Sequence, residues 1–373
     1  MAGAQPVNWE ALRPQLQRAF EFAQQQVRRV VETYPDFFPM YTVNGRWKHS
    51  GEAWTHWCEG FLPGMMWMIY EQTGDDWWRE QAEHYSRPLE PRKTDRAVHD
   101  LGFLFLSTYG RWYRLTNDPA LREVLIEAGR TLSLRFQEKG KYLCSFIGPQ
   151  SLFIDIMMNV GIIFWAAQQT GDERLWEVGT QHCLTTQKYL VREDGSTVHE
   201  GLFDTETGAF LRPSTHQGLH PDSCWARGLA WALYGFGTAY QYTLNPSFLA
   251  TAEKCARYYL EHVPEGKVPY WDFDLPPGPD QIWDSSAGAI AAAGLWNLAE
   301  LVPSTPLRQQ YREAALEILH TLTSEEFLAQ SRPGWEGILL HGVYHFHKKL
   351  GVDESVIWGD HYFLEALLKA LNP

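Results

Sequence analysis

The chain has 373 residues, a formal charge of −13 at pH 7, 45% hydrophobic residues and 14% aromatic residues. Because no basic stripe is present to displace the counterions of a nucleic-acid backbone, we expect no nucleic-acid partner. No segment reaches the uninterrupted apolar run of roughly 18 residues that a membrane span needs, so we expect no membrane contact. The five cysteines are scattered without a Cys-x-x-Cys pair, and the N-terminus has no apolar signal-peptide core. These features favour a cytoplasmic protein without disulfides or structural zinc.

Amphipathic and apolar segments alternate along the chain. At four places an apolar segment is followed by a short turn, such as Thr-Gly-Asp, and then by an amphipathic segment with Asp or Asn placed to cap it. This order is typical of repeated αα-hairpins. The amphipathic helices are expected at 8–33, 75–89, 119–136, 173–190, 246–262 and 305–324, and the apolar helices at 54–72, 99–115, 153–170, 223–242, 284–300 and 357–371.

Six helices of each kind predict an all-α fold, an (α/α)6 barrel in which the apolar helices form an inner ring and the amphipathic helices shield it. We expect a single domain over residues 1–373, with small hairpins in the loops 197–212 and 267–274. A closed ring leaves no obligate exposed apolar face, which favours a monomer. All inner helices run in the same direction, so their N-termini meet at one mouth, where we expect the functional site.

Carboxylates and tryptophans gather at this mouth, and the long loop 191–222 also opens there with several histidines. Pyranose C–H faces stack on aromatic rings, while carboxylates bind hydroxyl groups or move protons, so the combination is typical of a sugar site. The residues at these helix starts are Trp54, Trp57, Asp100, Asp155, Asp222, Trp225, Arg227, Trp231, Asp284, Trp358 and Asp360.

Asp155 lies in the stretch SLFIDIMMNVGIIFW (151–165), which is predicted to form the middle of a buried helix. Burying an unpaired carboxylate costs several kcal/mol or raises its pKa. Either a partner that the sequence hides satisfies Asp155, or the raised pKa serves a catalytic acid. Asp100, Asp222 and Asp284 each stand at a helix start, where an Asp is either a cap or a functional carboxylate.

Other chemistries find less support. His216 and His220 are four residues apart, but Gly218 and Pro221 interrupt a helical His-x-x-x-His face, so we expect no metal site. No Gly-x-Ser-x-Gly elbow occurs, which gives no support to serine-hydrolase chemistry.

At the inner-helix motifs the sequence resembles the unsaturated glucuronyl hydrolases of glycoside hydrolase family 88. The resemblance covers nearly the whole chain in order. It implies an (α/α)6 barrel that removes, without a cofactor, the 4,5-unsaturated uronic acid that polysaccharide lyases leave at a non-reducing end. The matching segments include EGFLPGMMWMIYEQTGD (59–75), HDLGFLF (99–105), IDIMMNVGIIFWAAQQTGD (154–172), THQGLHPDSCWARGLAWALYGF (215–236) and IWGDHYFLEALLKAL (357–371).

Carried over to this chain, the resemblance places the principal acid/base on Asp155 and its partner carboxylate on Asp100. The implied reaction hydrates the C4=C5 bond and needs an acid that is still protonated near neutral pH. The apolar neighbours of Asp155, and Asp100 if it lies close, are expected to raise the pKa of Asp155 accordingly. The implied substrate contacts are His199, Gln217, Arg227, Trp231 and either Trp54 or Trp57, and we add His216, His345 and Trp358 to this set.

The expected partner is a small unsaturated oligosaccharide of the glycosaminoglycan type. The segment 344–355 lacks the Ser-x-x-Ser-x-Lys arrangement associated with sulfate-preferring relatives, which favours an unsulfated or sparsely sulfated substrate. Two alternatives stay open. One is an unsaturated rhamnogalacturonyl hydrolase acting on pectin fragments, and the other is a non-catalytic sugar-binding toroid.

Overall fold

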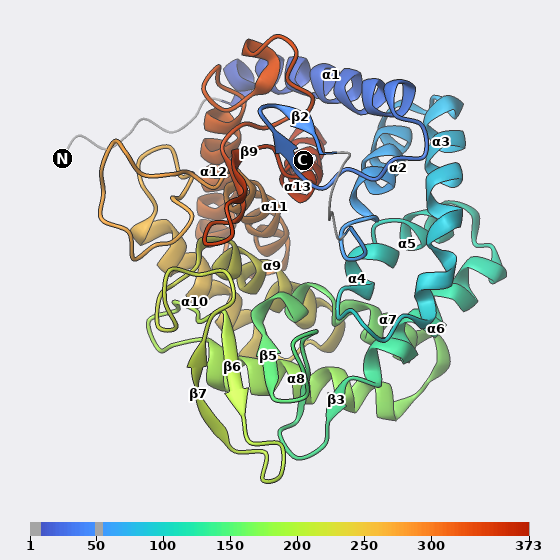
Figure 1. Ribbon diagram of the computed structural model, residues 1–373, viewed down its shortest axis with the longest axis vertical. Coiled ribbons are helices and arrows are strands. Elements are labelled where there is room, and N and C mark those ends of the chain that lie inside the picture. Colours follow the sequence, from blue (N-terminus) through green and yellow to red (C-terminus); the bar gives the residue numbers. More distant parts are fainter. Residues whose placement is uncertain (1–8, 49–54, 373) are drawn as a thin grey trace.

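The computed structural model describes residues 9–48 and 55–372, and its helices form two concentric layers around one axis (Figure 1). No helix in these two ranges is long and apolar enough to cross a membrane. The outer helices are α1 (Trp9–Thr33), α3 (Asp76–Ser86), α6 (Pro119–Ser133), α8 (Glu173–Leu190), α10 (Pro246–His262) and α12 (Thr305–Leu322). The inner helices are α2 (Phe61–Thr73), α4 (Leu101–Phe105) with α5 (Tyr109–Thr116), α7 (Gly161–Thr170), α9 (Ala226–Thr243), α11 (Ser285–Leu301) and α13 (Ile357–Leu371).

The inner ring closes through its last helix. Helix α11 packs against α9, α12 and α13, and α13 in turn packs against α2, which joins the two ends of the chain. The run of small residues in α11 lets it lie between neighbours on all sides, so 14 of its residues are buried. The outer helices bury only one face, as their amphipathic sequences require. The predicted (α/α)6 barrel is therefore confirmed.

The turns between paired helices have the predicted chemistry. Asp75, Asp118, Asp172 and Asn245 each precede an outer helix, and the side chain of each accepts a hydrogen bond from a backbone N–H of its first turn. Before two of these caps, Gly74 and Gly171 adopt positive φ angles of 67° and 69°, a conformation that glycine tolerates best. These turns fold the apolar helix back onto its amphipathic partner.

Three inner helices are shorter than predicted. The first begins at Phe61 and not at residue 54, and the third begins only at Gly161 because 151–158 form a strand and a 3-10 turn. The second, predicted over 99–115, is broken between α4 and α5. There the hydroxyls of Ser107 and Thr108 donate to the carbonyls of Phe103 and Leu104, a pattern that bends helices.

Short strands lie over the mouth of the ring. The hairpin predicted within 197–212 is confirmed by β6 (Glu200–Phe203) and β7 (Phe210–Ser214), whereas 267–274 contains only the isolated bridges Trp225–Asp272 and Tyr270–Trp283. The paired strands are β1 (Thr42–Val43) with β2 (Arg46–Trp47), β3 (Phe136–Gln137) with β4 (Tyr142–Leu143), β5 (Ser151–Phe153) with β6 (Glu200–Phe203) and β7 (Phe210–Ser214), and β8 (Gly342–His345) with β9 (Leu350–Glu354). The 3-10 helices are η1 (Arg87–Thr94), η2 (Ile154–Met158) and η3 (Ala329–Ser331).

Candidate active site

A small cavity of about 50 Å³ lies where the N-terminal ends of the inner helices meet. Asp100 precedes α4, and Arg227 lies in the first turn of α9, so the two reach the cavity from different parts of the ring. The cavity combines two carboxyl groups, one guanidinium, three imidazoles and aromatic walls. Its lining residues are Trp57, His99, Asp100, Phe146, Phe153, Asp155, His216, Gln217, Arg227, Trp231, Tyr344 and His345.

Asp155 lies on the 3-10 turn η2, directly after strand β5, and not inside a helix as predicted. Strand β5 pairs with β6, and the N–H of Ile154 donates to the carbonyl of His199 at 3.0 Å. This pairing brings Asp155 next to a histidine that lies 44 positions further along the chain. The hidden partner of the carboxylate is therefore His199, whose Nε2 lies 3.4 Å from Oδ2 of Asp155.

Asn159 ties the turn that carries Asp155 to the helix that follows Asp100. Its side-chain oxygen accepts the N–H of Phe103 at 2.8 Å, and its amide nitrogen donates to the carbonyl of Asp155 at 3.3 Å. Gly102 permits this approach, because a Cβ at that position would lie 2.5 Å from the Cα of Asn159. The buried Asn159 thus fixes the two carboxyl-bearing segments relative to each other.

The proton position on His199 follows from its hydrogen bonds. Nδ1 accepts the backbone N–H groups of His216 and Gln217, each at 3.2 Å, so the proton of the neutral ring is on Nε2. That nitrogen faces Asp155, and neither Nε2 nor Oδ2 of Asp155 has another hydrogen-bond partner within the described ranges. The imidazole is therefore oriented toward the carboxylate.

His99 is held in the same way beside Asp100. Its Nδ1 accepts the N–H of Phe146 at 3.1 Å, and its Nε2 lies 3.4 Å from Oδ1 of Asp100. Burial lowers the pKa of His99 to about 3, so the ring is neutral and presents an N–H to Asp100. Each carboxyl group of the site thus faces one backbone-anchored imidazole.

The pKa values of the two carboxyl groups shift in opposite directions. Burial raises the pKa of Asp100 well above its usual range, and the nearby Asp155 raises it further, so Asp100 holds its proton to a higher pH than a free Asp does. Burial also raises the pKa of Asp155, but the hydrogen bond and electrostatic interaction with His199, together with the charge of Arg227, lower it by more. The expectation that Asp155 has the raised pKa is therefore wrong, because its partners outweigh its apolar neighbours.

Arg227 is almost completely buried and contacts partners from several elements. Its guanidinium lies 3.4 Å from Oδ2 of Asp284 and donates to the carbonyls of Val343 and Tyr344. The ring centroids of Trp225 and Trp358 lie 4.5 and 5.1 Å from Cζ of Arg227. Both rings are therefore close enough for a cation–π interaction with the guanidinium. Arg227 thus joins α9, α11, α13 and the β8–β9 hairpin at the edge of the cavity.

Two further histidines of the cavity, His216 and His345, are uncharged at neutral pH. Burial lowers the pKa of His216 to about 4 and that of His345 to about 3. Their rings lie 5.1 Å apart, and both ring nitrogens of His345 are buried without a hydrogen-bond partner in the described chain. These nitrogens can accept or donate a hydrogen bond to a bound molecule.

Comparisons with known proteins show which family the chain belongs to. The sequence model described as Glycosyl Hydrolase Family 88 matches residues 27–274. The chain belongs to glycosyl hydrolase family 88. It is therefore a glycosidase.

Similar proteins of this family align with most of the chain. The unsaturated glucuronyl hydrolase of Bacillus sp. (strain GL1) is 36% identical over 91% of this chain and 93% of its own. The unsaturated chondroitin disaccharide hydrolase of Streptococcus pyogenes serotype M1 is 33% identical over 94% of this chain and 90% of its own. The crystal structure of an unsaturated glucuronyl hydrolase specific for heparin matches with a TM-score of 0.89 and 32% identity, over 96% and 97% of the two chains.

The structure of this family 88 enzyme brings most of the predicted site residues together. His199 contacts Asp155 from behind the cavity wall, and Trp358 lies beneath the wall against Trp57, with ring centroids 4.7 Å apart. Trp54 lies outside the described residues. The predicted residues that line the cavity are Asp155, Asp100, Gln217, Arg227, Trp231, Trp57, His216 and His345.

The carboxylates at other helix starts have structural roles. Asp284 caps α11 by accepting the N–H of Ser286, and it also pairs with Arg227. Asp360 accepts the N–H groups of Ile338 and Leu339. Asp100 is no cap, because its side chain accepts no hydrogen bond from the first turn of α4.

Sequence reasoning missed four residues of the cavity wall, namely His99, Phe146, Phe153 and Tyr344. His99 adjoins Asp100, and Tyr344 adjoins the predicted His345, so proximity to a predicted residue was the available signal. Phe146 lies in a loop with no periodic pattern, and Phe153 was assigned to a helix interior. Their places follow from strand pairing, which short strands signal weakly.

Arg227 is expected to be essential for stability. Replacing Arg227 with Ala leaves the buried Asp284 without its ion partner, and we expect the free energy of unfolding to fall by about 3–5 kcal/mol. Denaturant unfolding of the variant checks this loss. The double variant Arg227→Ala/Asp284→Ala should regain part of it, because the orphaned charge is removed. A single variant as stable as the parent would contradict the role of this ion pair.

Asp100 is expected to lower stability at neutral pH. Its folded-state pKa is raised, so the unfolded chain loses the proton first, and stability falls as pH rises from about 4 toward the folded-state pKa. Asp100→Asn should therefore raise the melting temperature at about pH 7, with little change at about pH 4.

Asp194→Asn offers a control of opposite sign. Burial raises the pKa of Asp194, but the hydrogen bonds from Ser196 and the charge of Arg192 lower it by more. Its carboxylate therefore stabilises the fold at pH values above the usual pKa of an Asp. The Asp194→Asn variant should melt at a lower temperature than the parent at about pH 7. If the difference in melting temperature between Asp100→Asn and the parent were the same at about pH 4 and about pH 7, Asp100 would be ionised in the folded state.

Proposed function

We propose that this glycosidase removes 4,5-unsaturated glucuronic acid from the non-reducing end of lyase-generated oligosaccharides of the glycosaminoglycan type. The observation that carries the proposal is the pair Asp100 and Asp155, which line one aromatic-walled cavity and whose pKa values shift in opposite directions. A site that holds one proton and one carboxylate can give a proton and take one in the same turnover. The names of the relatives described above agree with this substrate class.

The substrate carries a vinyl ether, in which C4=C5 is joined to the ring oxygen and to the C6 carboxylate. A proton added to C4 leaves an oxocarbenium-like centre at C5, and water attacks this centre as it loses a proton to a carboxylate. The resulting hemiketal opens, the glycosidic bond breaks, and a 4-deoxy-5-keto uronate is released. One water is consumed, and the enzyme returns to its starting protonation state.

In this scheme Asp155 is the principal acid/base, and Asp100 is the carboxyl group with which it shares the proton. Two interacting carboxyl groups titrate as a unit, so a proton held by Asp100 belongs to the pair. The anionic uronate adds a negative charge and removes water from the cavity. Both changes favour a neutral Asp155 when the alkene is bound. His199 and His99 keep the two carboxyl groups in place.

Substrate recognition is assigned to the remaining walls. Trp57 and Trp231 offer ring faces for stacking, and Trp358 supports Trp57 from below. His345 has two ring nitrogens without a partner among the described residues, which suit hydroxyl or carboxylate groups, and Arg227 supplies positive charge beside the cavity. Gln217 donates to the carbonyl of Tyr344 at 2.8 Å, which holds the loop that carries His216 against the β8–β9 hairpin.

Asp155→Asn tests the central assignment. The variant keeps the shape of the site but can neither donate nor accept the proton, so we expect the turnover number to fall by about 10²- to 10⁴-fold while the disaccharide still binds. Steady-state kinetics and equilibrium binding measure the two effects. Asp222→Asn is the matched control, because Asp222 is an exposed carboxylate near the start of α9. Substantial activity in Asp155→Asn would move the acid/base role elsewhere.

A panel of lyase-generated disaccharides tests the reaction itself. The conjugated alkene-carboxylate absorbs in the ultraviolet, and hydration should abolish this absorbance as a reducing sugar is released. We expect the fastest reaction with an unsulfated or sparsely sulfated glucuronyl disaccharide. A faster reaction with an unsaturated galacturonyl-rhamnose substrate would identify the pectin-directed activity instead. Binding without any loss of absorbance would leave a non-catalytic toroid.

The same proposal covers the domain organisation, oligomeric state, cofactor requirement and cellular location of the enzyme. All of residues 1–373 are assigned to one catalytic domain that acts as a monomer without a metal or organic cofactor. A cytoplasmic location is supported by five cysteines that are all free and buried, as expected in a reducing compartment.

A further inference from the structure

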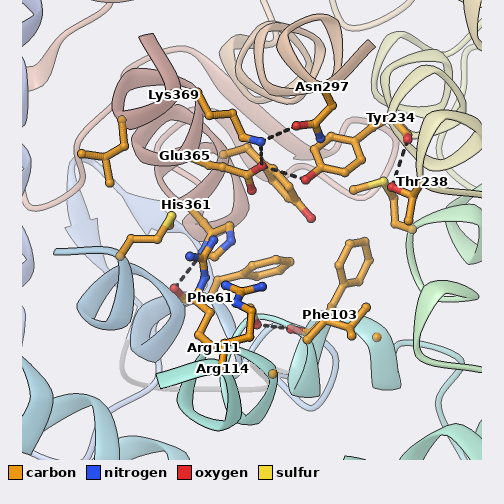
Figure 2. Close-up of a pocket in the computed structure, with 18 of the residues that line it drawn as sticks. Phe61, Phe103, Arg111, Arg114, Tyr234, Thr238, Asn297, His361, Glu365 and Lys369 are labelled. Atoms are coloured by element: carbon orange, nitrogen blue, oxygen red, sulfur yellow. Dashed lines mark hydrogen bonds and ion pairs between the residues drawn. The ribbon is translucent and has the colours of Figure 1, made fainter. Parts of the chain in front are cut away.

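A second and larger cavity, of about 740 Å³, opens at the opposite end of the barrel, where the inner helices end. It is lined by the last turns of α2, α5, α9 and α13 and by parts of α7 and α11 (Figure 2). Its volume lies within the usual range of small-molecule sites. The proposed reaction uses none of the charged groups that line it.

An aromatic layer separates this cavity from the catalytic one. Phe61, Phe103, Trp231 and Tyr362 come from α2, α4, α9 and α13 and form a closed circuit across the axis. Their successive ring centroids lie 5.2, 5.1, 5.5 and 6.0 Å apart. Phe61, Phe103 and Tyr362 line the second cavity, whereas Trp231 lines the catalytic one. The two cavities are therefore distinct sites.

The second cavity has an excess of positive charge in an acidic protein. Its charged lining consists of two arginines, one lysine and two glutamates. Arg111 pairs with Glu71 at 2.7 Å, and Lys369 pairs with Glu365 at 3.4 Å. Within the described ranges, the ion pair of Arg114 is with the other oxygen of Glu71, at 3.6 Å, and the Arg114 side chain is 62% exposed. Burial lowers the pKa of His361 to about 4, so this ring adds no charge at neutral pH.

The dipoles of the surrounding helices explain part of this charge. Cations near helix C-termini are favourable, and Arg114 and Lys369 lie in the last turns of α5 and α13. The dipoles do not explain why the same cavity is also lined by aromatic rings and side-chain amides. Trp165 and Tyr242 supply ring surface, and Gln241 and Asn297 supply side-chain amides.

We propose that this cavity is a second, non-catalytic binding site for a small acidic sugar such as a hexuronate. A guanidinium binds a carboxylate with charge-assisted hydrogen bonds, for which Arg114 is the available group beside Arg111. Amide side chains suit sugar hydroxyls, and an indole face suits the C–H surface of a pyranose. Figure 2 shows Arg114 and Asn297 on opposite sides of the pocket, which places these two functions across its width.

Binding of sodium glucuronate to the full-length protein tests the site. We expect isothermal titration to detect binding to the parent chain, and Arg114→Gln to weaken it by about ten- to hundredfold. Arg18→Gln is the matched control, since Arg18 is exposed on the outer helix α1 and carries the same charge. Glucose, which lacks the carboxylate, should bind much more weakly than glucuronate.

The hydrolytic activity of Arg114→Gln toward an unsaturated disaccharide should equal that of the parent, which separates this site from the catalytic one. Equal affinity of the parent and Arg114→Gln for glucuronate would place the ligand in the catalytic cavity and overturn the proposal. Absence of binding to the parent, or equal binding of glucose and glucuronate, would overturn it as well. These outcomes do not depend on whether the hydrolysis reaction is confirmed.

Discussion

The mouth of the barrel depends on the burial of one guanidinium. Arg227 is 2% exposed, so every hydrogen bond that it loses to water must be replaced by the protein. The replacements come from Asp284 on α11, from two carbonyls of strand β8, and from the faces of Trp225 and Trp358. Because these partners lie far apart in the sequence, satisfying one side chain requires the ring and the β8–β9 hairpin to be assembled together. Tyr344 and His345 reach the cavity as a result.

The two carboxyl groups show how similar surroundings give different protonation. Only 7% of the Asp100 side chain and 15% of the Asp155 side chain are exposed, and each faces an imidazole whose Nδ1 accepts backbone N–H groups. Loss of water and the charge of Asp155 raise the pKa of Asp100. At Asp155 the favourable partners outweigh the loss of water, and the pKa is lowered. The two pKa values are thereby separated, so Asp155 loses its proton at a lower pH than Asp100 does. The asymmetry arises from the neighbours and not from the depth of burial.

The sequence predicted the architecture well because helix periodicity and capping residues are local signals. Asp75 and Asp172 cap the helices that they were expected to cap. Asp155 was identified as unusual from its apolar neighbours, but its local structure and the direction of its pKa shift were predicted wrongly. Both errors have one cause, since the pairing of β5 with β6 ends the helical pattern and delivers His199. Such pairing is a long-range contact that no single segment of sequence contains.

The aromatic layer of Phe61, Phe103, Trp231 and Tyr362 also limits how a polymer can approach the enzyme. Because these rings close the axis of the barrel, the catalytic cavity is a blind pocket and not a tunnel. A polysaccharide cannot thread through it, so only the last sugar of a chain can reach Asp155. Both products must leave by the entrance that the substrate used, and the saccharide at the entrance must depart before the uronate beneath it. Cleavage is consequently confined to chain ends, one sugar for each encounter.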